Sequence, residues 1–172
     1  MPAFLSTWTR RLPASRAPAS PALGFVLWSC LGASLAIALT GWLSQASGLP
    51  WLMAPFGASC VLVFGLPDSP LAQPRSLIGG HLVASLVGLL VLHTLGPSWW
   101  AAGLAVGLAL ALMQLSRSVH APAGADPLVL MAGHAGLEAL LTPVLAGSLL
   151  ILLIALAVNN LRQRGSYPKY WI

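Results

Sequence analysis

The chain has 172 residues, of which 58% are hydrophobic and only 6% are charged. Soluble domains carry about 25% charged residues, so this composition excludes a soluble globular domain. Intrinsic disorder of the whole chain is excluded as well, because so few charges cannot keep a chain solvated. Three stretches lack Asp, Glu, Lys and Arg, and each can hold a helix of the roughly 20 residues that cross a bilayer: 17–67, 76–116 and 139–161. The composition predicts an integral membrane protein.

The formal net charge of +5 comes mainly from basic residues near the two ends of the chain. Basic clusters that flank apolar spans are typical orientation signals in membrane proteins, so we expect no nucleic-acid partner. The two cysteines, Cys30 and Cys60, lie in apolar runs without the spacing of metal ligands or of a disulfide framework. No metal and no cofactor are expected.

The two ends of the chain differ from the apolar region between them. Residues 1–21 carry Arg10 and Arg11 before a Pro-, Ala- and Ser-rich stretch, and we expect a disordered basic tail there. The apolar run that follows, 22–43, is longer than the roughly 7–15 residues of a cleaved signal, so it is expected to remain as the first span. The C-terminal tail, 162–172, combines basic residues with Tyr and Trp, which is typical of an interfacial anchor.

The region between the tails, 22–161, predicts an all-α membrane domain with four long transmembrane helices. Two shorter apolar pieces, Phe56–Leu66 and Pro127–Leu141, lie between the first and second and between the third and fourth of these spans. A helix of about 11 residues covers only about half of a hydrocarbon core of about 30 Å, so these pieces are expected to be broken or half helices. The four long spans are Ala22–Leu43, Leu77–Leu95, Trp99–Leu115 and Val144–Leu161.

The basic ends predict that both termini are cytoplasmic and that the number of crossings is even. Two arrangements of the short pieces satisfy this condition. If each piece re-enters and returns to its own side, Arg75 and Arg117 lie outside; if each completes a crossing, both lie inside with the termini. The tendency of basic residues to stay inside favours the second arrangement.

A short internal repeat relates the two halves of the chain. Residues Ala54–Ser59 (Ala-Pro-Phe-Gly-Ala-Ser) match Ala121–Asp126 (Ala-Pro-Ala-Gly-Ala-Asp) at four of six positions with an offset of 67, and Gly80 and Gly147 coincide at the same offset. Each hexamer follows a long span and opens a short piece. This order predicts two three-element repeats, about 22–95 and 99–161, and three crossings per repeat would make them inverted, as in many secondary transporters.

The two hexamers are the predicted binding site. Proline favours the first turn of a helix, and a helix N-terminus presents unpaired N–H groups that attract an anion. Two such ends meeting inside the membrane would hold a small anion without a buried Lys or Arg. The alternative is that these Pro and Gly residues serve only close helix packing. The candidate substrate-binding residues are Pro55, Gly57, Ala58, Ser59, His120, Pro122, Gly124, Ala125 and Asp126.

These segments resemble the HPP family of integral membrane proteins. The resemblance covers roughly residues 22–171 and rests on Ala54–Ser59, on Leu66–Arg75, on Gly79-Gly80-His81, on the naming motif His120–Ala125 and on the Tyr-Pro-Lys-Tyr-Trp tail. Ala121 replaces the first proline of the naming motif. The family implies four transmembrane helices, and its plant chloroplast and cyanobacterial members are associated with nitrite transport. We therefore expect a multi-pass protein of a bacterial inner (plasma) membrane.

The remaining polar residues suggest a gate and a proton route. Asp68 and Arg75 bracket a Pro-rich loop and could pair with each other beside the site. His81, His120 and Glu138 are candidates for a proton relay, because histidine titrates near neutral pH and ionisable groups in membranes avoid lipid. His134, four residues before Glu138, could bond to it. His93 is expected at the interface.

The function that these features predict is transport of a small, nitrite-like inorganic anion, by a carrier or a channel, with proton coupling as an option. The alternative is a non-transporting membrane subunit or assembly factor. We expect no enzyme, because the three acidic residues are scattered and no Ser-His-Asp triad, phosphate-binding loop or lipid-cleaving cluster is evident. The expected partners are the anion and membrane lipid, and a homo-oligomer is left open.

Overall fold

A computed structural model of the chain describes residues 19–172, and every regular element in this part is helical. The elements in chain order are α2 Leu23–Ser47, α3 Ala54–Gly65, η1 Pro70–Ala72, α4 Pro74–Leu95, α5 Trp99–Leu115, η2 Ala121–Ala125, α6 Asp126–Ala132, η3 Leu137–Leu140, η4 Leu141–Leu145 and α7 Ala146–Arg162. The predicted all-α class is therefore confirmed. The expected N-terminal tail lies outside the described residues, apart from its last three positions.

Three segments are long and apolar enough to cross a membrane, namely Leu23–Ser47, Pro74–Leu95 and Leu137–Arg162. α5 begins and ends as predicted, but its 17 residues leave it among the shorter apolar helices. In residues 19–172, three segments and not four are long and apolar enough to be spans, so the expected count of four is not confirmed. The three long apolar segments support the prediction of a membrane protein.

Proline sets the starts of several helices. α3, α4, η2 and α6 each carry a proline in the first two positions, where its missing N–H leaves no internal bond unmade. α2 ends at Gly48, whose φ of 70° gives the left-handed turn that releases the chain from the helix.

The short pieces behave differently from each other. α3 is one regular helix of 12 residues, whereas the piece expected over 127–141 is broken. It consists of α6, with seven residues, then a turn in which His134 has a φ of 48°, and then η3. Because this turn ends α6, His134 and Glu138 do not share a helical face, and both side chains are exposed. The expected bond between them is therefore wrong.

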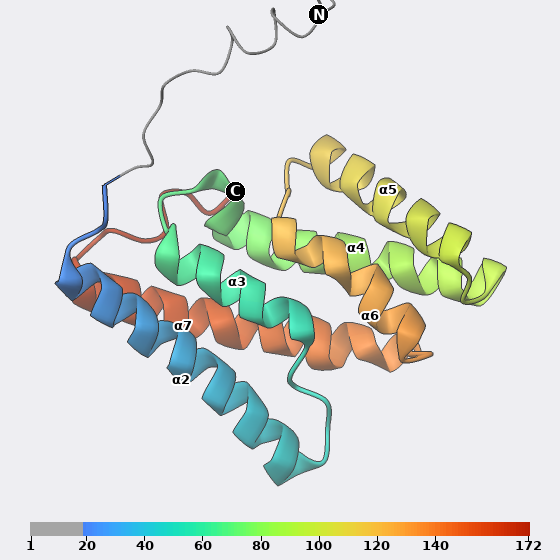
Figure 1. Cartoon of the computed structure of the whole chain (residues 1–172), viewed down its shortest axis with the longest axis horizontal. Helices are drawn as coiled ribbons and strands as arrows, with labels where there is room; N and C mark the ends of the chain where they lie inside the picture. The colour runs from blue at the N-terminus through green and yellow to red at the C-terminus, as the bar shows by residue number, and fades with distance from the viewer. Residues whose placement is uncertain (1–18) are drawn as a thin grey trace, which may run out of the picture.

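α4 is the central helix, because it packs against α5, α6 and α7 as well as η1 and η2, while α2 packs on α3 and α7. Figure 1 shows that α2 begins and α7 ends at the same end of the molecule. Along the long axis of that view, α3 and η2 both begin near the middle and lead in opposite directions. α3 and η2 are also in contact. The two short pieces thus meet inside the fold.

Candidate functional site

Five polar side chains meet between the short helices and α4, and each has an exposed fraction of 0%. We call this group the buried polar network. α3 contributes one member and α4 contributes two, while the residue before η2 and the first residue of α6 contribute one each. Buried polar groups cost free energy unless they pair with each other, so this cluster is held by its own hydrogen bonds. Its members are Ser59, His81, Ser85, His120 and Asp126.

His81 is at the centre of the buried polar network. Its Nδ1 atom lies 2.7 Å from Asp126 Oδ2, and its Nε2 atom lies 2.9 Å from Ser59 Oγ. The Ser85 hydroxyl, one helical turn further along α4, donates to the same Asp126 oxygen at 3.1 Å. The Phe56 ring packs edge-on to the imidazole with centroids 5.3 Å apart, which fixes the plane of the His81 ring.

His120 joins the network from the other side of Ser59. Its Nε2 atom lies 2.9 Å from Ser59 Oγ, and its Nδ1 atom donates to the Leu71 carbonyl oxygen in η1 at 2.7 Å. Ser59 Oγ also lies 3.2 Å from the Pro55 carbonyl oxygen one turn earlier in α3. A continuous chain of polar contacts therefore runs from Asp126 through His81, Ser59 and His120 to the η1 loop.

Two glycines allow this close approach. A Cβ atom added to Gly80 would lie 2.5 Å from His120 Cβ and 3.0 Å from the Ser118 carbonyl oxygen. A Cβ atom added to Gly147 would collide with the Phe56 ring and lie 2.9 Å from the Trp51 carbonyl oxygen. Only glycine leaves room for His120 and Phe56 at these positions.

The sequence predicted part of this arrangement. Ser59, His81, His120 and Asp126 were all candidates, and the structure brings them together. Ser85 and the Leu71 carbonyl were missed. The available signal for Ser85 was its position four residues after His81, on the same face of an apolar helix.

The other candidate residues of the two hexamers make no side-chain hydrogen bond to the buried polar network. Pro55 and Pro122 are buried at helix starts, Gly124 and Ala125 are half-buried, and Gly57 and Ala58 are exposed on the outer face of α3. No atom lies within 4 Å of a Cβ position at Gly57 or Gly124. Their backbone is therefore uncovered, in contrast to that of Gly80 and Gly147.

Three expectations about charged and catalytic residues are wrong. Asp68 does not pair with Arg75: it pairs with Lys169 at 3.0 Å, and Arg75 donates to the Ser116 carbonyl oxygen at 2.7 Å. Glu138 is exposed and lies outside the buried polar network, because the turn after α6 carries it away. A Ser-His-Asp connectivity does exist, since the fold joins residues that are far apart in sequence.

The C-terminal tail covers the η1 loop. The Tyr167 hydroxyl donates to the Ala72 carbonyl oxygen at 2.7 Å, and the Lys169 backbone N–H donates to Gln73 Oε1 at 2.7 Å. Burial raises the pKa of the Tyr167 phenol, so this group remains a hydrogen donor. Because Leu71 is in the same loop, the tail, η1 and His120 form one connected unit.

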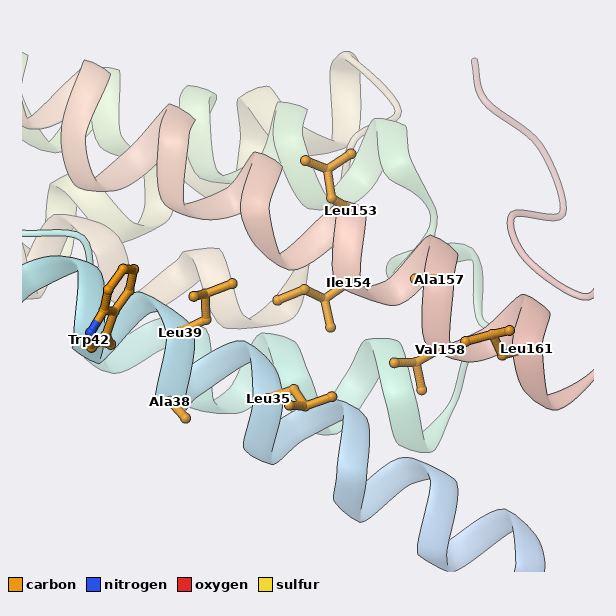
Figure 2. A pocket seen from close by; sticks show the side chains of 9 residues that line it. All are labelled: Leu35, Ala38, Leu39, Trp42, Leu153, Ile154, Ala157, Val158 and Leu161. Atoms are coloured by element: carbon orange, nitrogen blue, oxygen red, sulfur yellow. The ribbon is translucent and has the colours of Figure 1, made fainter.

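Two surface hollows near these helices are lined by no side chain of the buried polar network. A groove of about 620 Å³ between α2 and α7 is apolar, as Figure 2 shows, and suits lipid chains better than an anion. A cleft of about 330 Å³ lies beside the start of α3 and includes Met53, Ala54, Glu138 and Thr142. In residues 19–172, no group of three or more metal-ligating side chains is placed to hold a metal ion.

Comparison with known proteins gives a family and two relatives. The family described as "HPP, transmembrane region" matches residues 18–168. Two transmembrane proteins of Dictyostelium discoideum are similar: one is 42% identical over 128 residues, which is 70% of this chain and 45% of that protein. The other is 40% identical over 129 residues, or 70% and 42% of the two chains. The match thus spans less than half of each relative, and no solved structure matches the chain significantly.

Proposed function

The chain belongs to the HPP transmembrane family, and we propose from this that it transports a small inorganic anion such as nitrite across the membrane. The observation that carries the proposal is the buried polar network where α3 meets η2 and α6. Ionisable groups inside a membrane protein are costly and mark transport pathways more often than structural contacts. The choice of nitrite rests on the resemblance of the sequence motifs to those of the HPP family.

We further propose that the two halves of the domain are inverted repeats. Support comes from a pair of equivalent contacts: Gly80 approaches the Ser118 carbonyl, and Gly147 approaches the Trp51 carbonyl. The offset of 67 relates Gly80 to Gly147 and Trp51 to Ser118, so it exchanges the two contacts. The same offset relates Ser59 to Asp126. Opposite directions of α3 and α6 in Figure 1 agree with this relation.

The proposed anion site is beside the imidazoles rather than at bare helix ends. η2 has only five residues, and the carboxyl group of Asp126 begins α6, so this end offers little attraction to an anion. Among residues 19–172, no Lys or Arg is buried, which leaves His81 and His120 as the buried groups that can become positive. A histidine that binds the anion after protonation supplies the charge that a fixed cation supplies elsewhere.

Transport through this site requires a rearrangement, because the side chains of the buried polar network have no exposed surface. At one end the η1 loop and the tail residue Tyr167 cover the network. At the other end the cleft of about 330 Å³ reaches Met53 and Ala54 at the start of α3. We propose that alternate opening at these two places gives access to the site.

The proposed orientation has the η1 end in the cytoplasm of a bacterial cell. Arg75 contacts Ser116, and Lys169 contacts Asp68, so the start of α4, the end of α5 and the C-terminal tail lie at one end. Basic residues favour the cytoplasmic side. Both termini would then be cytoplasmic, in an inner (plasma) membrane.

A second candidate function follows from the connectivity of Ser59, His81 and Asp126. Acyl-transfer enzymes activate a serine through Nε2 of a histidine whose Nδ1 faces an aspartate, as here. Against an enzyme stands the complete burial of Ser59 and its contact with a second imidazole, His120. A fluorophosphonate probe should leave Ser59 unlabelled; labelling of Ser59 would make hydrolysis the better proposal.

The test of the proposed function is uptake by the purified protein in liposomes. Nitrite should accumulate faster than in protein-free liposomes, and His120→Gln should lower the rate at least about tenfold by removing about 1.4 kcal/mol or more of stabilisation. His93→Gln is the matched control, because His93 is exposed and bonds only to its own helix at Leu89. If nitrite, nitrate, formate and chloride all fail to move, the proposal is wrong, and a packing role for the glycines is favoured.

A further inference from the structure

We propose that the buried polar network, formed where Ser59 Oγ bridges the Nε2 atoms of His81 and His120, is a proton-binding site that holds one shared proton at rest. The inference rests on the proposed function and deepens it, because it assigns the co-transported ion and the atoms that carry it.

The position of one hydrogen is fixed at the η1 end of the network. The Leu71 carbonyl oxygen can only accept, so the His120 Nδ1 atom 2.7 Å away must carry a hydrogen. In a neutral His120 ring the Nε2 atom is then an acceptor. Its contact with Ser59 Oγ at 2.9 Å consequently needs the serine hydrogen.

At the Asp126 end of the network, the contact with His81 also requires the hydrogen of the Ser59 hydroxyl. If Asp126 is ionised and His81 is neutral, Nδ1 of His81 donates to the carboxylate at 2.7 Å and Nε2 becomes an acceptor. Ser59 has one hydrogen but then faces two acceptor nitrogens at 2.9 Å. One contact would bring two lone pairs together, which is unfavourable in a buried site.

One additional proton completes every contact. It can sit on Asp126, on His81 or on His120, and the hydrogens of Ser59 and His81 shift to suit each position. In all three cases each contact from Asp126 to Leu71 contains one hydrogen, and the network has no net charge. A neutral network is also the form that costs least to bury in a membrane protein.

The surroundings of Asp126 favour the position on the carboxyl group. Among the buried side-chain nitrogen and oxygen atoms of residues 19–172, Asp126 Oδ1 alone has no hydrogen-bond partner. An ionised carboxylate would leave this charged oxygen without a donor, whereas a protonated carboxyl group leaves a neutral one. The resting arrangement is therefore a protonated Asp126 donating to Nδ1 of His81, with the His81 hydrogen on Nε2.

The contact between Ser59 and Pro55 allows the network to bind a second proton. If both imidazoles donate from Nε2 to Ser59 Oγ, the serine hydrogen can turn to the Pro55 carbonyl oxygen at 3.2 Å. All contacts are again complete, but the network now carries one positive charge. An anion beside it restores neutrality, so one anion and one proton enter together. Cotransport of this kind removes the electrical cost of moving an anion toward a negative interior.

No other charged side chain of the surrounding helices contacts this chain of hydrogen bonds in the described part of the protein. Cys60 follows Ser59 in α3 but lines a hollow with Ser29 and Cys30 of α2. Tyr167 donates to Ala72, and Arg75 donates to Ser116. The remaining titratable groups on α4, α5, α6 and α7 and their connections are exposed or bonded within their own helix or to other partners: His93, Arg117, His134, Glu138 and Arg162.

The first test reads the hydrogens directly, without transport. In purified protein with ¹⁵N-labelled histidine, His120 should carry its hydrogen on Nδ1 and His81 should carry one on Nε2 in the resting state. His81→Gln and His120→Gln assign the signals. Two neutral rings that both carry the hydrogen on Nδ1 alone, with Nε2 bare, would overturn the proposal.

The second test measures proton movement with the anion. In liposomes with an internal pH dye, nitrite uptake by the wild type and by His93→Gln should bring in about one proton per anion, after correction with protein-free liposomes. Ser59→Ala breaks the bridge, so this ratio should fall toward zero. Anion uptake without protons in the wild type would overturn the inference and leave the proposed function intact. The expected histidine signals without any anion uptake would overturn the proposed function and leave the proton-binding site intact.

Discussion

At the scale of single residues, Gly80 is a position where one added methyl group would disturb the buried polar network. An alanine methyl group there would lie 2.5 Å from His120 Cβ and 3.0 Å from the Ser118 carbonyl oxygen. His120 cannot move away without stretching its bond to Leu71. We expect Gly80→Ala to destabilise the folded protein by about 1–3 kcal/mol, as overpacking does, and to lower nitrite uptake strongly. Thermal unfolding in detergent and uptake in liposomes measure the two effects.

Gly107→Ala is the control for that substitution. Gly107 is a helical glycine of α5 with no atom within 4 Å of its Cβ position. The alanine should therefore leave uptake unchanged and stabilise the helix by up to about 1 kcal/mol. Equal behaviour of the two variants would mean that the contact between Gly80 and His120 has no influence on the network.

The sequence could identify the polar residues of the site one by one but not their connection. Ser59 and Asp126 stood out because they end the two matching hexamers, and His120 because it precedes the second hexamer. The contacts that join them link residues 22 to 61 positions apart. Spacing along a helix reveals neighbours only three or four residues apart, so the central place of His81 depended on the fold.

At the scale of elements, the C-terminal tail and η1 form a cover over the network. Tyr167→Phe deletes the hydroxyl that donates to the Ala72 carbonyl oxygen at 2.7 Å. The loss of one buried hydrogen bond should weaken the cover by about 1 kcal/mol, or about fivefold in its opening equilibrium. Hydrogen exchange at the amides of Leu71 and Ala72 should accelerate accordingly. Since burial raises the pKa of the Tyr167 phenol, the difference from Phe should persist across the neutral and mildly alkaline range.

Tyr170→Phe is the matched comparison for the tail. The Tyr170 hydroxyl donates to the Pro70 carbonyl oxygen at 3.3 Å, but this contact is exposed to solvent. Water can replace an exposed hydrogen bond, so exchange in η1 should change little. If both variants accelerate exchange to the same extent, the buried phenol is not what holds the loop.

Elements with a continuous apolar pattern were predictable, and interrupted ones were not. α5 begins and ends where the pattern predicted, since Ser98 caps its start and its interior is apolar throughout. The piece over 127–141 reads as equally apolar, yet it breaks at His134, where φ is 48°. A left-handed residue costs little at an isolated turn, and composition does not mark it. For this reason Glu138, a candidate for the proton relay, is exposed and lies outside the network.

At the scale of the whole molecule, the proposed inversion of the two halves depends on backbone contacts that leave little trace in sequence. The hexamers match, but most of the remaining equivalence is apolar against apolar. The exchange of contacts between Gly80 with Ser118 and Gly147 with Trp51 involves carbonyl oxygens, which every residue possesses. Such contacts require a glycine on one side only, and Gly80 and Gly147 are the one pair of glycines outside the hexamers that coincide at this offset.

The arrangement of the short pieces can be tested by the side of the membrane on which connections lie. In a background with Cys30 and Cys60 replaced by alanine, single cysteines are introduced at Ser116, beside Arg75, and at Thr94, near the end of α4. Both side chains are exposed. If each short piece completes a crossing, the cysteine at 116 should react with an impermeant maleimide only from the cytoplasmic side, and the cysteine at 94 only from outside.

The same experiment separates crossing from re-entry because the two arrangements assign opposite sides to position 116. If α3 returned to the side where α2 ends, the start of α4 would lie outside the cell, and Ser116 with it, since Arg75 bonds to its carbonyl oxygen. A cysteine at Gln163, after α7, is cytoplasmic in either arrangement and serves as the reference. Positions 116 and 163 labelled from the same side would support six crossings and thus inverted halves. Labelling from opposite sides would require re-entrant pieces, and the exchange of contacts between Gly80 and Gly147 would then need another explanation than inversion.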